Sequence, residues 1–236
     1  MAEGQTLPPF RLLPMKAPDI QMTRAEGGVI YVTPRQSPGD RPRTIPHCLD
    51  ERAAEHPDRP FLREKDPATG EWQTLTYGEA KSITDSLAQA FLDMGAGPDA
   101  PVMILSGNST RAAMVILAAQ KIGAPAAPIS VPYSLMSTDH EKLKHCFGAV
   151  KPAIIFAEQY EPFRKAISAL NADACHIFSA DPAGENSVRH YDDLVATEPT
   201  DAVASAMARL DDASIAKYLF TSGSTGLPKP VPTTQG

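Results

Sequence analysis

The chain has 236 residues, with 22 basic and 28 acidic side chains and a formal net charge of −6. A chain of this length buries roughly 70% of its extended-chain surface on folding, so one large domain or two small ones are expected. A hydrophobic content of 42% excludes a disordered tail, and the acidic balance argues against a nucleic-acid binder. Proline is unusually frequent, with 23 residues against a usual share of ~5%.

The sequence favours a cytoplasmic protein. No apolar run reaches the ~18–20 residues of a membrane span, and the proline-rich start lacks the pattern of a secretory leader. Cys48, Cys146 and Cys175 are widely separated, which favours inert thiols in a reducing compartment. His140 and His145 are five residues apart and do not share a helix face, so no metal site is expected.

Residues 1–43 are expected to form a proline-rich N-terminal arm. Seven prolines in this stretch each remove a backbone donor and fix φ, so long elements cannot form across them. One short strand is expected at residues 29–32. The arm would lie on the surface of the domain that follows.

Regular elements are expected from residue 44 onward. The pattern predicts a short helix over residues 45–54, two strands at 61–63 and 73–75, and a long helix that begins at Thr76 and ends at Gly95. Thr76 and Glu79 have the spacing of a capping box, in which each side chain satisfies the other residue's free amide. Thr138 and Glu141 have the same spacing and predict a second capping box.

Strands and helices then alternate. Strands are expected at residues 102–105, 126–129, 153–157, 175–179 and 215–220, and helices at 110–122, 138–147, 161–170 and 203–209. This order predicts an α/β fold with a parallel sheet flanked by helices. Ligands bind beyond the carboxyl ends of such strands, so the turn at residues 106–108 and the loop after Ile129 are candidate site walls. Ordinary turn chemistry explains both segments equally well.

Residues 221–229, Thr-Ser-Gly-Ser-Thr-Gly-Leu-Pro-Lys, directly follow an expected apolar strand. Gly223 and Gly226 can adopt positive φ and let the backbone approach a ligand closely. Hydroxyl donors come from Thr221, Ser222, Ser224 and Thr225. Lys229 adds a positive charge on a long stem, and successive amides of such a turn can form an anion nest. The segment therefore predicts a phosphate-binding loop, with a flexible linker as the alternative.

The segment differs from the known glycine-rich nucleotide loops. In a Walker loop the lysine and a hydroxyl residue follow the second glycine directly, whereas here Leu227 and Pro228 intervene and Pro230 follows the lysine. The G-x-G-x-x-G pattern is also absent from it. Its phosphate chemistry therefore has to be of another kind.

Residues 219–229, Leu-Phe-Thr-Ser-Gly-Ser-Thr-Gly-Leu-Pro-Lys, resemble the signature loop of the acyl-adenylate-forming family, the AMP-dependent synthetases and ligases. That family includes acyl- and aryl-CoA synthetases, peptide-synthetase adenylation domains and luciferases. Residues 117–129 resemble its helix–glycine–strand step, and residues 45–60 and 76–79 also fit. The resemblance runs in matching order from 44 to 236. Residues 130–135 and 139–143 look most like feruloyl-CoA synthetases.

The resemblance implies a two-step acid–CoA ligase. A carboxylate attacks the α-phosphate of Mg·ATP to give an acyl-adenylate and pyrophosphate, and the thiol of coenzyme A then displaces AMP. By the family's pattern the loop, with Thr221, Ser222, Gly223, Ser224, Thr225 and Gly226, cradles the β- and γ-phosphates. Lys229 would be the catalytic residue that neutralises charge on the departing pyrophosphate. The expected substrate is a hydroxycinnamate such as ferulate, with fatty or other aryl acids as alternatives.

Two positions depart from the family's pattern. Glycine commonly follows the lysine, where this chain has Pro230, and histidine often stands where this chain has Gln235. Pro230 restricts Lys229 to extended conformations, which either shifts the lysine relative to the phosphates or has no effect.

Residues 44–236 are expected to be the N-terminal part of an adenylation domain that ends just after the phosphate loop. The family's later motifs and its mobile C-terminal domain are not found in the sequence, so this chain alone is expected to be inactive. A free-standing nucleotide- or phosphate-binding module and an interaction domain are the alternatives. A dimer is left open.

Overall fold

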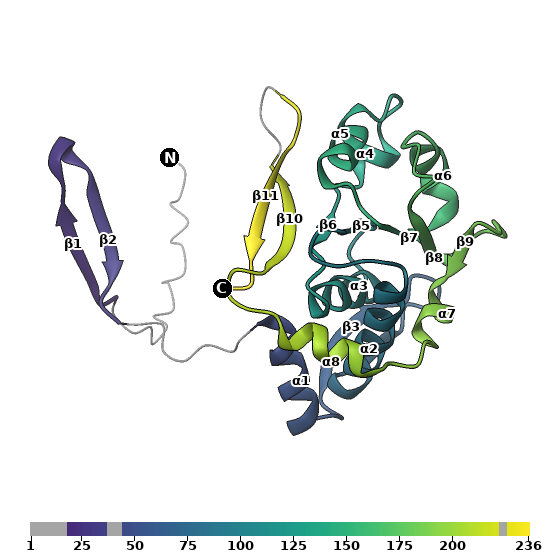
Figure 1. The fold of residues 1–236 in the computed structure, drawn as a ribbon, viewed down its shortest axis with the longest axis horizontal. Helices are drawn as coiled ribbons and strands as arrows, with labels where there is room; N and C mark the ends of the chain where they lie inside the picture. The colour runs from purple at the N-terminus through teal and green to yellow at the C-terminus, as the bar shows by residue number, and fades with distance from the viewer. Residues whose placement is uncertain (1–17, 37–43, 222–225) are drawn as a thin grey trace, which may run out of the picture. The chain divides into compact units, whose positions relative to one another are not determined.

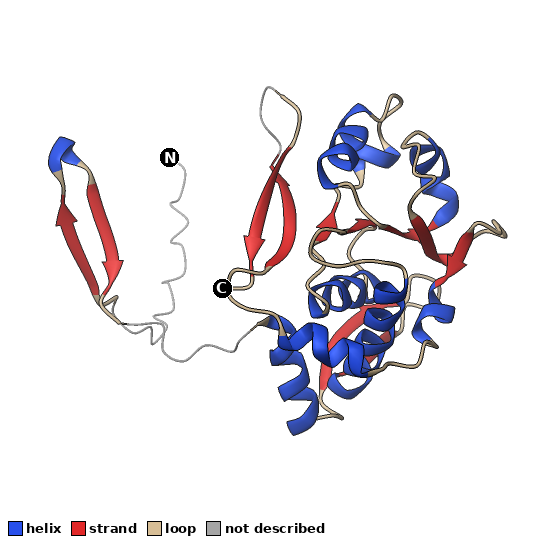
Figure 2. Ribbon diagram, viewed as in Figure 1, coloured by secondary structure: helices blue, strands red, loops and turns tan. Residues whose placement is uncertain are grey.

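The structure, a computed structural model, describes residues 18–36, 44–221 and 226–236 (Figure 1). It divides into two compact units, Met1–Arg41 and Pro42–Gly236. Figure 2 shows that helices and strands make up most of the second unit.

The first unit contains a β-hairpin. Strands β1 (Ile20–Arg24) and β2 (Ile30–Pro34) pair antiparallel and are joined by the short 3-10 helix Glu26–Gly28. The short strand expected at residues 29–32 is present as β2, whereas its partner β1 was not predicted. Alternation along the paired strands places their apolar side chains on one face: Ile20, Met22, Ile30 and Val32.

The second unit begins with helix α1 (Ile45–Glu55) and the hairpin of β3 (Pro60–Lys65) and β4 (Trp72–Thr76). Within the described residues a second sheet has seven strands, in the order β11-β10-β6-β5-β7-β8-β9. These strands are β5 (Val102–Leu105), β6 (Ala126–Pro128), β7 (Ile154–Gln159), β8 (His176–Asp181), β9 (Val188–His190), β10 (Ile215–Thr221) and β11 (Lys229–Thr234). All neighbouring pairs are parallel except β10 and β11, so the expected α/β class is confirmed.

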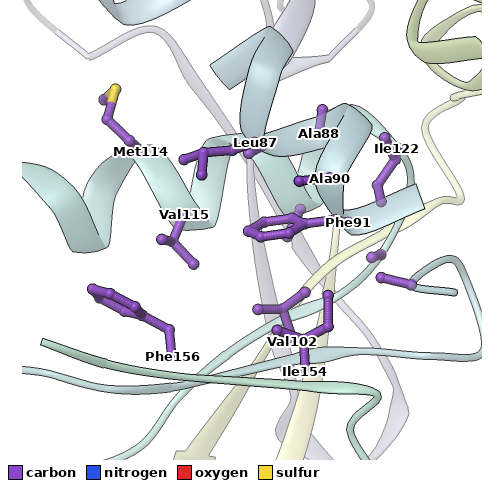
Figure 3. Packing of buried hydrophobic residues seen from close by; sticks show 14 of the residues in the cluster. Leu87, Ala88, Ala90, Phe91, Val102, Met114, Val115, Ile122, Ile154 and Phe156 are labelled. Atoms are coloured by element: carbon purple, nitrogen blue, oxygen red, sulfur yellow. The ribbon is translucent and has the colours of Figure 1, made fainter. Parts of the chain in front are cut away.

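Helices cover both faces of this sheet. The helices after α1 are α2 (Tyr77–Asp93), α3 (Thr110–Lys121), α4 (Pro132–Leu135), α5 (Glu141–Val150), α6 (Tyr160–Ser168), α7 (Tyr191–Val195) and α8 (Asp201–Ala208). One core forms where α2 and α3 pack on the sheet, with Phe91, Val115 and Phe156 at its centre (Figure 3). The other core contains buried residues of α5 and α6. Alternate residues of β5 enter the two cores, which explains why its sequence is apolar throughout.

The first predicted capping box is confirmed. The amide of Glu79 donates to Thr76 Oγ1 at 3.2 Å, and the amide of Thr76 donates to Glu79 Oε2 at 2.8 Å. The second box, at Thr138 and Glu141, was wrong. Helix α5 begins after His140, whose φ is 54°, and the amide of Glu141 donates to Asp139 Oδ1 at 3.1 Å. Asp139 satisfies the first amide of the helix, so Thr138 has no capping role.

The Thr76→Ala substitution is expected to lower the free energy of unfolding by about 1 kcal/mol, because the Glu79 amide loses its acceptor. Urea denaturation followed by circular dichroism measures the change. Thr138→Ala is the matched control and should change stability by less than about 0.5 kcal/mol, since Thr138 is exposed and caps no helix. Equal losses in both variants would contradict the capping role.

The capping box also predicts a pH dependence. Hydrogen bonds from the Thr76 amide and hydroxyl lower the pKa of Glu79 below its ordinary value of 4.5. A carboxylate with a lowered pKa stabilises the fold above its unfolded pKa, and this contribution is lost as the pH falls through the folded pKa. The wild-type protein should therefore exceed Glu79→Gln in stability at pH 7, and the difference should shrink in acid. A constant difference from pH 7 to pH 3 would contradict this assignment.

Candidate functional site

The predicted phosphate loop lies between two paired strands. Strand β10 ends at Thr221 and β11 begins at Lys229, and these two residues form the last pair of the hairpin. Thr221 Oγ1 donates to the backbone carbonyl of Lys229 at 3.5 Å, a long contact. The structure therefore brings together the first and last residues of the predicted site. Ser222, Gly223, Ser224 and Thr225 lie outside the described residues.

Lys229 is available for an external ligand. Its side chain is exposed, and within the described residues it forms no salt bridge. A lysine without an ion-pair partner among the described residues can place its charge on a bound phosphate at no cost to a described ion pair.

Gly226 does not use the conformational freedom that glycine provides. It is not among the described glycines with positive φ. A Cβ atom added at this position would meet no described atom within 4 Å. The packing of the described protein therefore does not require glycine here, and the missing side chain leaves open space beside the backbone.

Pro230 and Pro232 are compatible with the strand they occupy. Both prolines lie in β11, the outer strand of the sheet among the described residues, and they pair with Phe220 and Tyr218 of β10. Residues two apart in a strand direct their backbone groups to the same side, so both missing amides can face away from β10. Pro230 keeps Lys229 extended, and this is the conformation that β11 requires.

A histidine from another part of the chain contacts the end of the loop. His145 Nε2 lies 2.9 Å from the carbonyl oxygen of Pro228, which is buried. A carbonyl only accepts hydrogen bonds, so Nε2 is the donor. Sequence reasoning missed this contact, because 83 residues separate the two positions.

The turn at residues 106–108 lines a different cavity, of about 330 Å³, at the carboxyl ends of β5 and β7. Glu158 accepts hydrogen bonds there from Ser109 Oγ at 2.6 Å and Ser106 Oγ at 3.3 Å, and forms a salt bridge with Arg111 at 3.3 Å. The loop after Ile129 does not line this cavity. The two predicted site walls follow neighbouring parallel strands at the same edge of the sheet, but they do not line this cavity together.

Among the described residues no group of three or more His, Cys, Asp or Glu side chains could hold a metal ion. Likewise, none of the helices that the structure describes has the length and apolar character needed to cross a membrane.

Comparison with known proteins agrees with the fold. The pattern of the AMP-binding enzyme family matches residues 49–236. The medium/long-chain-fatty-acid–CoA ligase FadD6 of Mycobacterium tuberculosis is 31% identical over 186 residues, which cover 79% of this chain and 28% of FadD6. Long-chain fatty acid transport protein 2 of Rattus norvegicus is 27% identical over 194 residues, which cover 79% of this chain and 29% of that protein.

A solved structure shares the fold. A luciferase-like enzyme from the mealworm Zophobas morio superposes with a TM-score of 0.69 at 20% identity, over 91% of this chain and 46% of that one. The shared fold agrees with the family match, and together they define an AMP-binding enzyme. The chain belongs to the AMP-binding enzyme family, and it spans less than half of the length of these three relatives.

Proposed function

We propose that the chain is the N-terminal part of an ATP-dependent carboxylic acid–CoA ligase. In the first step a carboxylate oxygen attacks the α-phosphorus of Mg·ATP, and pyrophosphate leaves. In the second step the sulfur of coenzyme A attacks the acyl carbon, and AMP leaves. The observation that carries the proposal is the segment from Thr221 to Lys229, whose two end residues pair across the β10–β11 hairpin inside the region of the family match.

The geometry supports distinct roles for the two ends of this segment. Lys229 is exposed and free of described ion pairs, so we assign it to the negative charge that builds on the departing pyrophosphate. The open space beside Gly226 allows close approach of phosphate oxygens to the backbone. We assign binding of the β- and γ-phosphates to Thr221, Ser222, Gly223, Ser224, Thr225 and Gly226. Magnesium enters with ATP as part of the substrate.

We propose a hydroxycinnamate such as ferulate as the acid, on the resemblance of residues 130–135 and 139–143. A medium- or long-chain fatty acid is the second candidate, and the name of FadD6 favours it. We also propose that residues 44–236 form the N-terminal part of an adenylation domain, that residues 1–43 form an arm, and that the protein is cytoplasmic.

The test is ATP–pyrophosphate exchange by the full-length protein with ferulate, benzoate, a medium-chain and a long-chain fatty acid. We expect the fastest exchange with ferulate, followed by formation of its CoA thioester. Faster exchange with a fatty acid would replace the substrate and keep the reaction class. No exchange with any acid would contradict the proposed reaction.

The 236-residue chain alone is expected to show no exchange at the full-length rate. Calorimetric titration with Mg·ATP and with pyrophosphate tests the alternative of a stand-alone binding module. No heat at millimolar ligand would remove that alternative. Full-rate exchange by this chain would contradict its proposed dependence on further segments.

A further inference from the structure

Helix α5 provides a fixed support beside the phosphate loop. Leu143 and Cys146 of this helix are fully buried in the core that α5 and α6 share, and Phe220 of β10 packs against the same core. Helix α5 also lies against β11. His145 lies between Leu143 and Cys146 in the sequence of the helix and is half-buried. Its backbone position is therefore fixed by core packing.

The bond from His145 acts on the peptide unit that precedes Lys229. The Pro228 carbonyl and the Lys229 amide belong to one planar group, so holding the carbonyl oxygen also fixes the orientation of the amide. Pro228 has no backbone N–H, so its carbonyl is its one backbone hydrogen-bonding group.

Further constraints act on the other side of the lysine. Thr221 pairs with Lys229 across the hairpin, and Pro230 excludes helical conformations at Lys229. With His145 in place, the backbone of Lys229 is held on both sides while its side chain stays free to reach a ligand. Catalytic groups that neutralise developing charge depend on such prior positioning.

We propose that His145 is a positioning residue, which orients the backbone of Lys229 toward the phosphates of ATP through its hydrogen bond to Pro228. This inference rests on the proposed ligase function. His145 does not touch the substrate in this role. Its effect is transmitted by the Pro228–Lys229 peptide unit.

The experiment compares His145→Leu with His145→Gln in the full-length protein by ATP–pyrophosphate exchange. Leucine removes the donor at similar size, and glutamine retains an N–H donor. Loss of one neutral hydrogen bond should lower kcat by about 3- to 10-fold in His145→Leu, with the KM for the acid little changed. His145→Gln should retain more of the rate. His176→Leu, a substitution at an exposed histidine, is the matched control and should leave the rate unchanged.

A double-mutant cycle with Lys229→Ala separates positioning from simple stabilisation. If His145 acts through Lys229, His145→Leu should have less than about a twofold effect in the Lys229→Ala background. Fully additive losses would overturn the proposal, as would a wild-type rate in His145→Leu. If His145→Leu does not fold, His145→Glu, whose carboxylate has no donor, takes its place in the comparison with His145→Gln. Equally low rates in His145→Gln and His145→Glu would then overturn the proposal. Lack of exchange by the wild-type protein with every acid would instead refute the ligase function, and the positioning role with it.

Discussion

Lys229→Ala in the full-length protein is expected to lower ATP–pyrophosphate exchange by about 100- to 1,000-fold. Removal of one preorganised group that stabilises transition-state charge has an effect of this size. The Lys229 side chain is exposed and lacks a described ion pair, so the melting temperature should not change. The rate and the melting curve are measured on the same preparation.

Two variants make this result specific. Lys229→Arg keeps the charge with a different shape and should recover only part of the rate. Lys165→Ala removes an exposed lysine from α6 and should behave like wild type. An unchanged rate in Lys229→Ala would favour an interaction domain that keeps the fold without the chemistry.

Lys121→Ala is expected to lower the free energy of unfolding by about 3 kcal/mol. The side chain of Lys121 is 2% exposed, and its ammonium group forms salt bridges with Asp50, at 2.7 Å, and with Asp85. These three residues come from α3, α1 and α2, so one buried cation ties three helices together. Removal of one partner from a buried ion pair leaves charge without compensation, which costs about 3–5 kcal/mol. The carboxylates of Asp50 and Asp85 are partly exposed, so we expect a loss at the lower end of this range.

Lys81→Ala is the matched control for this loss. Lys81 binds the other oxygen of Asp85 at 2.5 Å, but its side chain is 40% exposed and its partner is one helical turn away. Such pairs contribute less than about 1 kcal/mol. Replacing Asp50 and Asp85 by asparagine should recover part of the stability of Lys121→Ala, as urea denaturation would show. Equal losses in Lys81→Ala and Lys121→Ala would contradict the buried-cation account.

Local signals predicted the regular part of the fold well. The helix that begins at Thr76 and the apolar strand β5 follow from neighbouring residues alone, and both are present. The second capping box was not formed because α5 begins at Glu141 and not directly after Thr138. Ser137 and Asp139 accept the hydrogen bonds from the amides of His140 and Glu141 instead. Spacing alone does not distinguish these cases.

Long-range features could not be predicted. Strand β11 was not expected, because Pro230 and Pro232 oppose a central strand and only its place at the edge of the described sheet makes them acceptable. The hydrogen bond of His145 and the salt bridges of Lys121 join residues far apart in sequence. The segment at residues 221–229 could be predicted as a candidate site from the sequence, because its glycines, hydroxyl residues and lysine are consecutive or nearly so.

The prolines of β11 also bear on how the molecule meets other chains. An outer strand with free amides and carbonyls is a template on which another strand can add, and this is a common route to aggregation. If the proline positions face outward, an added strand would meet the carbonyl groups of Pro230 and Pro232 but no backbone N–H groups at these two residues. Two of the prolines therefore make the outer edge of the described sheet a poorer template for an added strand.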